Sequence, residues 1–162
     1  MVRRAALAAF VVAALAGAPA WALDVVGLDG KTVSLAAKDY AALPRVTLTV
    51  TQHGKKHNFQ GPLLSNVLKF VNAPAGEALR GKELTDVVIV TATDGYQVVL
   101  ALAETDSAIR KQKILLADKM DGAALPDNDG PYRLVVEGDL KPARSARMVA
   151  RIELKRLAAP KP

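Results

Sequence analysis

Short runs of β-forming residues, separated by turn residues, recur along the chain from residue 24 onward and constrain its fold more than any other feature. In Arg45–Gln52 (RVTLTVTQ) apolar and polar side chains alternate, which predicts a half-buried strand. Asp86–Thr93 (DVVIVTAT) is the most apolar run and is expected to lie inside a sheet. Asp-Gly pairs at 29–30 and 94–95 stand between such runs and predict tight hairpin turns.

The other expected strands are equally short, and one helix stands out at about 62–71. Its single apolar face consists of residues three and four positions apart: Leu63, Leu64, Val67, Leu68 and Val71. The further strands are expected at Asp24–Leu28, Lys31–Leu35, a segment ending at Phe59, Tyr96–Leu102, Lys113–Ala117, Tyr132–Glu137 and Ala146–Leu154. Because strands and helices do not alternate, we predict an α+β domain of mixed, mainly β architecture with one clear helix.

The first 22 residues have the pattern of a secretory signal peptide (1–22). Two arginines precede the apolar run Ala5–Gly17, and Ala20-Trp21-Ala22 is a small-x-small cleavage site. The mature chain is therefore expected to be a soluble protein of a bacterial periplasm. An arginine pair also occurs in twin-arginine signals, but the hydrophobic core and the lack of a preceding polar residue favour export of the unfolded chain.

Length, charge and cysteine content limit what the mature chain can be. About 140 residues remain after cleavage, enough for a single domain, which we place at 23–157, with 158–162 as a disordered tail. The formal net charge of +6 falls to +4 when Arg3 and Arg4 leave with the signal peptide, and the remaining charges are dispersed, so nucleic-acid binding is not expected. The sequence contains no cysteine, which excludes disulfides, thiolate metal ligands and a cysteine nucleophile.

A basic segment follows the apolar run RLVVEG near the end of the sequence, and it holds Arg144, Arg147 and Arg151. Two interpretations stay open. The arginines can lie on a solvated edge strand, where charge discourages pairing with other chains. Alternatively, the segment can bind an anion: Ser145 and Arg147 offer a hydroxyl and a planar guanidinium, which suit phosphate or carboxylate, and Arg144 adds a second charge.

Three stretches, in this order, resemble the molybdopterin-binding domain of the sulfite oxidase family. Phe59–Val71 (FQGPLLSNVLKFV) is similar to that family's aromatic-x-Gly-x-x-Leu-x-x-x-Leu segment, and Thr91–Glu104 (TATDGYQVVLALAE) is similar to its DGY turn. Asp121–Leu154 is the most specific stretch and resembles the family pattern DG-x-x-L, GGP-x-RLVVPG and SVKW-x-x-x-I. The resemblance implies a sulfite-oxidase-type molybdopterin-binding fold over most of the mature chain.

The resemblance also implies where a cofactor would lie. In that family the SVKW segment is on the phosphate side of the cofactor, and Ser145-Ala146-Arg147-Met148 matches it with the serine kept and the aromatic residue lost. Ser145, Arg147 and Arg144 are therefore expected to bind a ligand, together with His53 and Tyr96 on neighbouring turns. We predict neither a catalytic residue nor a metal ligand.

Enzymes of that family hold molybdenum through a cysteine thiolate just before the aromatic-x-Gly segment. The corresponding residues here are Val50-Thr51-Gln52-His53, without a cysteine. Molybdopterin is thus the cofactor that the resemblance implies, whereas molybdenum catalysis is unsupported. Whether the chain is an enzyme stays open at this point.

Two further motifs contain residue types that bind metals. In HGKKH, His53 and His57 are predicted to face each other across a three-residue loop, but two ligands are too few for a tight zinc site and two lysines oppose a cation. Asp127-Asn128-Asp129-Gly130 looks like the start of a calcium loop but lacks the closing glutamate. Solvated turn residues explain the first motif better, and a turn stabilised by Asp and Asn side chains explains the second better.

These features predict an exported domain that binds a small anion or a pterin-like ligand, without molybdenum catalysis. The cleft is expected between the His53 turn, the Asp94–Tyr96 turn and the Arg144–Arg147 loop. The first alternative is a pterin- and molybdenum-dependent periplasmic oxidoreductase. The second is a structural partner domain of a membrane-bound sensor or redox complex.

Overall fold

The computed structural model describes residues 22–52 and 54–158 of the 162-residue chain. The predicted signal peptide (1–22) and tail (158–162) therefore lie almost wholly outside the described residues, and His53 lies outside them as well. Over the part of the chain that the structure describes, no helix has both the length and the apolar character needed to cross a membrane.

The described residues form short strands joined by turns and short helices. The strands are β1 (Leu23–Val26), β2 (Thr32–Leu35), β3 (Arg45–Gln52), β4 (Lys55–Pro62), β5 (Asp86–Ala92), β6 (Gln97–Ala101), β7 (Ile114–Ala117), β8 (Lys119–Met120), β9 (Ala123–Ala124), β10 (Arg133–Val136) and β11 (Val149–Arg156). The α-helices are α1 (Ala37–Ala41) and α2 (Leu64–Leu68). The 3-10 helices are η1 (Lys69–Val71), η2 (Gly76–Ala78), η3 (Gly81–Thr85), η4 (Leu102–Thr105) and η5 (Pro142–Arg144).

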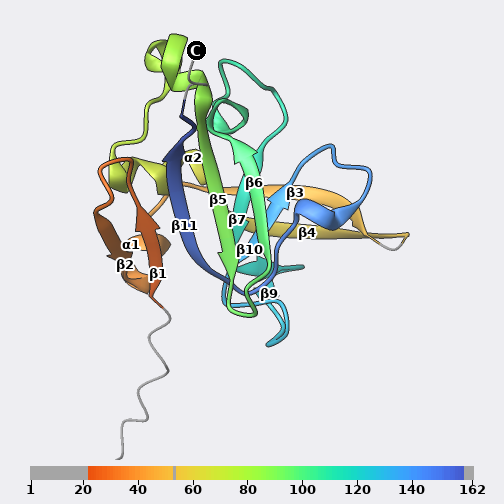
Figure 1. Ribbon diagram of the computed structural model, residues 1–162. Helices are drawn as coiled ribbons and strands as arrows, with labels where there is room; N and C mark the ends of the chain where they lie inside the picture. Colours follow the sequence, from red (N-terminus) through yellow and green to blue (C-terminus); the bar gives the residue numbers. More distant parts are fainter. Residues whose placement is uncertain (1–21, 53, 159–162) are drawn as a thin grey trace, which may run out of the picture.

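The largest sheet has the strand order β2-β1-β11-β5-β6 (Figure 1). β1 runs parallel to β11, and the other neighbouring pairs are antiparallel, so the sheet is mixed. β11 lies in the middle of this sheet, where β1 and β5 satisfy its backbone on either side, and its Ile152 and Leu154 side chains are buried. The interpretation of the basic segment as a solvated edge strand is therefore wrong, since Arg151 lies on a central strand.

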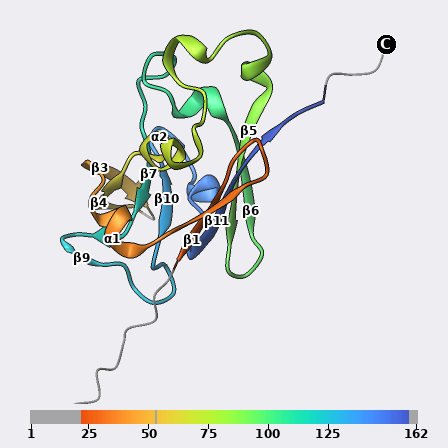
Figure 2. The ribbon, with the colours of Figure 1, turned by 90° about the vertical axis from the view of Figure 1, so that its left-hand side faces the viewer.

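Two smaller sheets, β7–β10 and β3-β4-β8-β9, complete the fold, and β7 and β10 are buried along their whole length. On one face, Leu116 and Leu134 join the main core together with α2 and the five-stranded sheet. On the other face, Leu115 and Val135 join a second core with Phe59 of β4. Figure 2 shows the five-stranded sheet and the β3–β4 hairpin on opposite sides of β7, β10 and α2.

The predicted helix at 62–71 is present but begins later, because α2 and η1 together cover residues 64–71. Gly61 and Pro62 instead end strand β4. Gly61 packs against the backbone of β7, where an added Cβ would lie 2.1 Å from the carbonyl oxygen of Leu116. A close approach of two strands, and not the start of a helix, therefore explains this glycine.

The predicted α+β class, mainly β with one clear helix, is confirmed. Arg45–Gln52 coincides with β3, and Asp86–Thr93 extends only one residue beyond β5. The strand predicted at Ala146–Leu154 begins only at Val149, after a residue with positive φ, Met148. The two-residue strands β8 and β9 are too short to show a periodicity, and the sequence does not predict them.

Candidate functional site

Residues 137–148, which join β10 to β11, form one wall of three adjoining hollows, and we call this segment the site loop. Pro142 and Ser145 line all three hollows. The main hollow has a volume of about 440 Å³ and is lined by Gln52, His57, Met120, Pro126, Asn128, Asp129, Arg133, Pro142, Ser145 and Arg147. A second hollow of about 460 Å³ lies between the site loop and the end of β3, and a third of about 230 Å³ lies beside Tyr96. The two larger volumes fall in the usual range of small-molecule sites, roughly 300–1,000 Å³.

Backbone hydrogen bonds fix the C-terminal end of the site loop. The Leu134 N–H on β10 donates to the Ala146 carbonyl oxygen over 2.8 Å, and the Met148 N–H donates to the Asp129 carbonyl oxygen over 2.9 Å. These bonds hold the loop between β10 and the turn that precedes it. The segment from Ser145 to Arg147 is therefore positioned by backbone hydrogen bonds, and the buried side chain of Ala146 packs into the main core.

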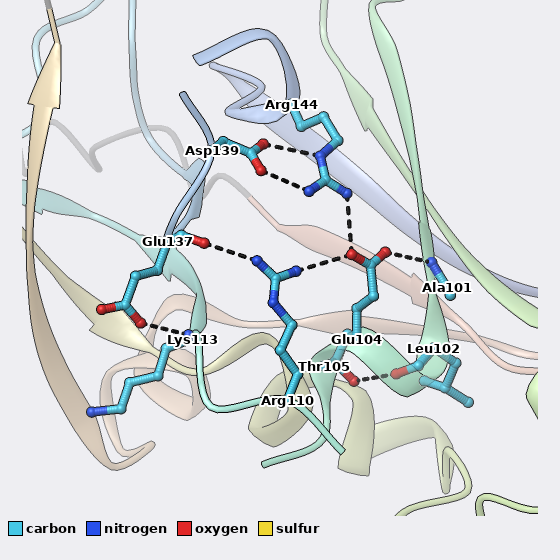
Figure 3. Close-up of polar contacts among 9 residues, drawn as sticks. All are labelled: Ala101, Leu102, Glu104, Thr105, Arg110, Lys113, Glu137, Asp139 and Arg144. Carbon is cyan, nitrogen blue, oxygen red and sulfur yellow. Dashed lines mark hydrogen bonds and ion pairs between the residues drawn. The ribbon is translucent and has the colours of Figure 1, made fainter. Parts of the chain in front are cut away.

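Arg144 lies in a network of ion pairs that attaches the site loop to the neighbouring segments (Figure 3). Its Nε and Nη2 donate to the two carboxylate oxygens of Asp139 over 2.9 and 2.7 Å, and its Nη1 donates to Glu104 over 3.3 Å. Glu104 also accepts from Arg110 (2.9 Å) and from the Ala101 N–H (3.1 Å). These contacts give Arg144 a role in holding the loop, whereas its role in binding a ligand stays a prediction.

A buried ion pair lies at the main hollow. Arg133, only 8% exposed, donates through Nη1 to Asp129, only 6% exposed, and through Nη2 to Gln52 over 3.0 Å. Its guanidinium carbon lies 5.1 Å from the centre of the Phe59 ring, a cation–π contact. Arg147 Nε lies 3.7 Å from the second carboxylate oxygen of Asp129. One carboxylate thus faces two guanidinium groups, and the hollow has an excess of positive charge.

Some polar groups at the main hollow keep hydrogen-bonding capacity. Arg133 Nε is buried without a hydrogen-bond partner among the described residues, and the Ser145 hydroxyl and the side-chain amide of Asn128 line the same hollow. The Arg147 side chain is 57% exposed, and its long contact with Asp129 leaves most of its five N–H donors available. The predicted pair of Ser145 and Arg147 therefore lies together at one hollow, and the binding of an anion there stays a prediction.

Tyr96 contacts the site loop from the turn between β5 and β6. Its hydroxyl donates to the carbonyl oxygen of Ala143 over 2.7 Å, and its N–H donates to Asp94 within the turn over 2.9 Å. Tyr96 lines the third hollow together with Ser145 and Arg147. The fold thus brings three predicted site residues together, and Tyr96 also supports the loop.

His57 lines the main hollow, although not in the arrangement that the sequence suggests. β3 and β4 pair with Val50 opposite His57, and Gln52 opposite Lys55 is their last pair before the turn. The prediction that His53 and His57 face each other is therefore wrong, because the hairpin is tighter than a three-residue loop would make it. Among residues 22–52 and 54–158, no group of three or more His, Cys, Asp or Glu side chains is arranged to hold a metal ion.

Arg133 and Asp129 are the site residues that the sequence analysis does not identify. Arg133 lies within the apolar run RLVV, and Asp129 precedes it by four residues in a turn that looks solvated. A charged residue at the start of an apolar run with no polar alternation was the available signal, because such a residue needs a partner when it is buried.

Comparisons with known proteins agree with this geometry. The family model described as "Oxidoreductase molybdopterin binding domain" matches residues 10–161. The chain belongs to this family. A similar solved structure is the sulfane dehydrogenase SoxCD from Paracoccus pantotrophus, with a TM-score of 0.64 and 19% sequence identity, over 83% of this chain and 38% of that chain. This likeness shows the fold, and the present chain spans less than half of the SoxCD chain that it matches. A search of curated protein sequences finds no match.

The residues at the site fit only part of a molybdenum–pterin cofactor. Gln52 lines the main hollow in the segment where the thiolate ligand of molybdenum is expected, and the sequence has no cysteine to supply that ligand. In contrast, Ser145 and Arg147 offer donors that suit a phosphate or carboxylate group. The site therefore fits an anionic ligand and does not fit the metal.

Proposed function

We propose that this domain binds a small anion or a pterin-like ligand in the main hollow and does so without molybdenum catalysis. We further propose that it acts in the periplasm as an exported binding or accessory module. The observation that supports the binding role most strongly is that Ser145, Asn128 and Arg147 converge on one hollow with donors to spare. Family membership makes a pterin the organic ligand to test first.

Each residue at the hollow has a distinct part in this proposal. Arg147 provides the main contact, because a planar guanidinium can donate two parallel hydrogen bonds to an oxyanion. Ser145 and Asn128 add one donor each and fix the orientation of the ligand. Arg133 contributes positive charge from a fixed position, since Asp129 and Gln52 already accept from its Nη atoms.

A thermal-shift screen tests the proposal directly. The panel contains sulfate, phosphate, organic phosphates and pterins, and at least one compound should raise the melting temperature. A ligand present at 100 times its Kd stabilises a protein by about 2.7 kcal/mol, which corresponds to a shift of several degrees. Arg147→Glu should abolish the shift, whereas Arg151→Glu, on the neighbouring β11, is the matched charge-reversal control and should keep it.

A screen without any stabilising compound would contradict the binding role. It would favour the second alternative, a structural partner domain of a membrane-bound sensor or redox complex. In that case Arg147→Glu and Arg151→Glu would affect stability alike.

The first alternative is a pterin- and molybdenum-dependent periplasmic oxidoreductase, and family membership is the observation that favours it. It needs a metal ligand other than cysteine, because the sequence contains no cysteine. The metal content of the native protein distinguishes this alternative from the proposed function.

Export is tested separately from ligand binding. Cleavage after Ala22 predicts that protein recovered from the periplasm of its native host begins at Leu23. N-terminal sequencing or intact mass spectrometry measures this position. An uncleaved N-terminus on protein in the cytoplasmic fraction would contradict the proposed location and leave the binding proposal intact.

A further inference from the structure

The main hollow contains a titratable group that the proposed function above does not use, the imidazole of His57 on β4. Its Nδ1 lies 2.8 Å from Oδ2 of Asp121, and its side chain is 26% exposed. The other carboxylate oxygen of Asp121 accepts from the Asn58 N–H over 2.8 Å, and the Asp121 N–H donates to the Asn58 carbonyl oxygen over 2.8 Å. The carboxylate is thus held against the imidazole ring.

The turn between β8 and β9 places this carboxylate. Asp121 (φ 52°) and Gly122 (φ 85°) both have positive φ, as in the two-residue turns that match the twist of a hairpin. Aspartate and asparagine are among the few side chains that tolerate this backbone region. The position therefore accepts Asp or Asn and few other residues, and here it carries the one that can bear a charge.

The contact with Asp121 determines which ring nitrogen of His57 exchanges its proton. Hydrogen bonds from the Asn58 N–H and from His57 hold the pKa of the Asp121 carboxyl below its usual value. The carboxylate is therefore ionised at neutral pH and can only accept hydrogen bonds. Nδ1 must then carry a hydrogen whether the ring is neutral or charged. The proton that the ring gains and loses belongs to Nε2.

We propose that Nε2 of His57 is a second, proton-dependent anchor for an oxyanion in the main hollow, so that ligand binding is coupled to protonation of the ring. This inference rests on the proposed function, because it concerns the same hollow as Ser145 and Arg147. In the charged ring, Nε2–H donates to the oxyanion and adds to the positive charge of Arg147. In the neutral ring, the Nε2 lone pair repels the oxyanion. The ligand class that follows is a fully ionised oxyanion, such as a sulfate, a carboxylate or a phosphate dianion.

The other charged groups around the ring do not remove this dependence. Asp129 and Arg133 form a pair and largely compensate each other, whereas Arg147 is the exposed positive charge at the hollow. Lys55 lies two positions from the ring along β4, and β3 and β8 bring the uncharged Val50 and Met120 beside this part of the strand. Lys55 and Arg147 thus carry positive charge near the ring, and Asp121 carries negative charge against it. A bound oxyanion adds negative charge and shifts the balance toward the charged ring.

Sulfate is a suitable probe, because sulfate itself does not titrate near neutral pH. Any pH dependence of its affinity therefore comes from the protein. Calorimetric or NMR titrations at about pH 5.5 and about pH 8 bracket the usual range of imidazole. We expect sulfate to bind the wild-type domain about tenfold more tightly at the lower pH, which equals one pKa unit of coupling. His57→Gln should still bind sulfate, with an affinity that no longer depends on pH. Asp121→Asn should show a smaller pH dependence.

Two controls separate this inference from the proposed function. Lys56→Gln changes an exposed charged residue next to His57 that does not line the hollow, and it should keep the full pH dependence. NMR of the His57 ring should show more charged imidazole when sulfate is added at a fixed pH, a response that a purely structural histidine would not give. Sulfate binding that requires Arg147 but has the same pH dependence in His57→Gln would overturn the anchor and leave the proposed function standing. Absence of sulfate, phosphate and pterin binding at either pH would overturn both.

Discussion

At the scale of single residues, the site depends on one buried acid, Asp129, that faces two arginines. Ser145 and Arg147 could be predicted because they fall in a segment that resembles a known family pattern. Arg133 could not be predicted in the same way, since a sequence does not show that a charged side chain in RLVV has a buried partner. The partner, Asp129, lies in the turn before β10, and the position of that turn depends on how distant segments pair.

Replacement of Arg133 tests the buried ion pair. Arg133→Met keeps the approximate volume but leaves Asp129 buried with only its long contact to Arg147. We expect the free energy of unfolding to fall by about 3–5 kcal/mol, as for other buried pairs that lose one partner. Urea denaturation measures this, and the double variant Arg133→Met/Asp129→Asn should recover a large part. A loss under about 1 kcal/mol would show that the pair is not effectively buried.

Gly61 provides a second prediction at this scale. Gly61→Ala would place a Cβ 2.1 Å from the Leu116 carbonyl oxygen and 2.8 Å from the Ala117 Cα, so β4 and β7 must move apart. We expect a loss of about 3 kcal/mol in the free energy of unfolding. Lys56→Ala, an exposed change on the same strand, is the control and should stay within about 0.5 kcal/mol of wild type. Equal stability of the two variants would contradict the close strand contact.

At the scale of elements, segments distant in the sequence hold the site loop in place, among them the turn with Tyr96 and the 3-10 helix with Glu104. No sequence pattern predicts these contacts. Periodicity predicts the long strands well, because each has one buried face and the alternation is visible over seven or eight residues. Periodicity fails for the two-residue strands β8 and β9. It also fails for the pairing of β3 with β4, because the turn, and not the alternation, decides which residues lie opposite each other. It also misplaces the start of α2, because Gly-Pro suits both a helix start and a close strand contact.

Removal of Glu104 should loosen the site loop. Glu104→Ala takes an acceptor from Arg144, Arg110 and the Ala101 N–H, all partly exposed, so we expect a loss of about 1–2 kcal/mol in the free energy of unfolding. Hydrogen exchange should become faster in the site loop (residues 137–148) and stay unchanged in β7. Glu153→Ala, which removes an exposed pair with Arg151, is the control. Unchanged exchange in the site loop would contradict the role of the network in holding it.

At the scale of the whole molecule, two cores share the β7–β10 pair, and the first and last strands lie side by side as β1 and β11. The class of the fold could be predicted because it follows from the number and length of the elements. The pairing of β1 with β11 could not be predicted, since no local pattern records it. The same is true of Tyr40, which reaches from α1 to the backbone of β7.

Tyr40 stabilises the fold through a contribution that is lost at alkaline pH. Its hydroxyl donates to the Leu116 carbonyl oxygen over 2.5 Å, and burial, with a smaller effect of the nearby Asp118, raises the pKa of Tyr40 above its usual value near 10.0. A raised pKa in the folded state means that the contribution is complete below about pH 10 and is lost as the pH rises further.

The variant Tyr40→Phe tests this contribution. It should lower the free energy of unfolding by about 1 kcal/mol at neutral pH, the value of a lost hydrogen bond. The difference from wild type should shrink above about pH 10. Chemical denaturation at several pH values measures both effects. A difference that stays constant or grows with pH would contradict the assignment.

The central claim is that a domain of a molybdopterin-binding family here binds an anionic ligand without molybdenum. Elemental analysis of the protein purified from its native host, grown with ample molybdate, tests this claim most directly. The account predicts much less than one molybdenum or tungsten atom per chain, because the sequence offers no thiolate to hold either metal. Molybdenum near one atom per chain, together with bound pterin, would contradict the account and establish the oxidoreductase alternative.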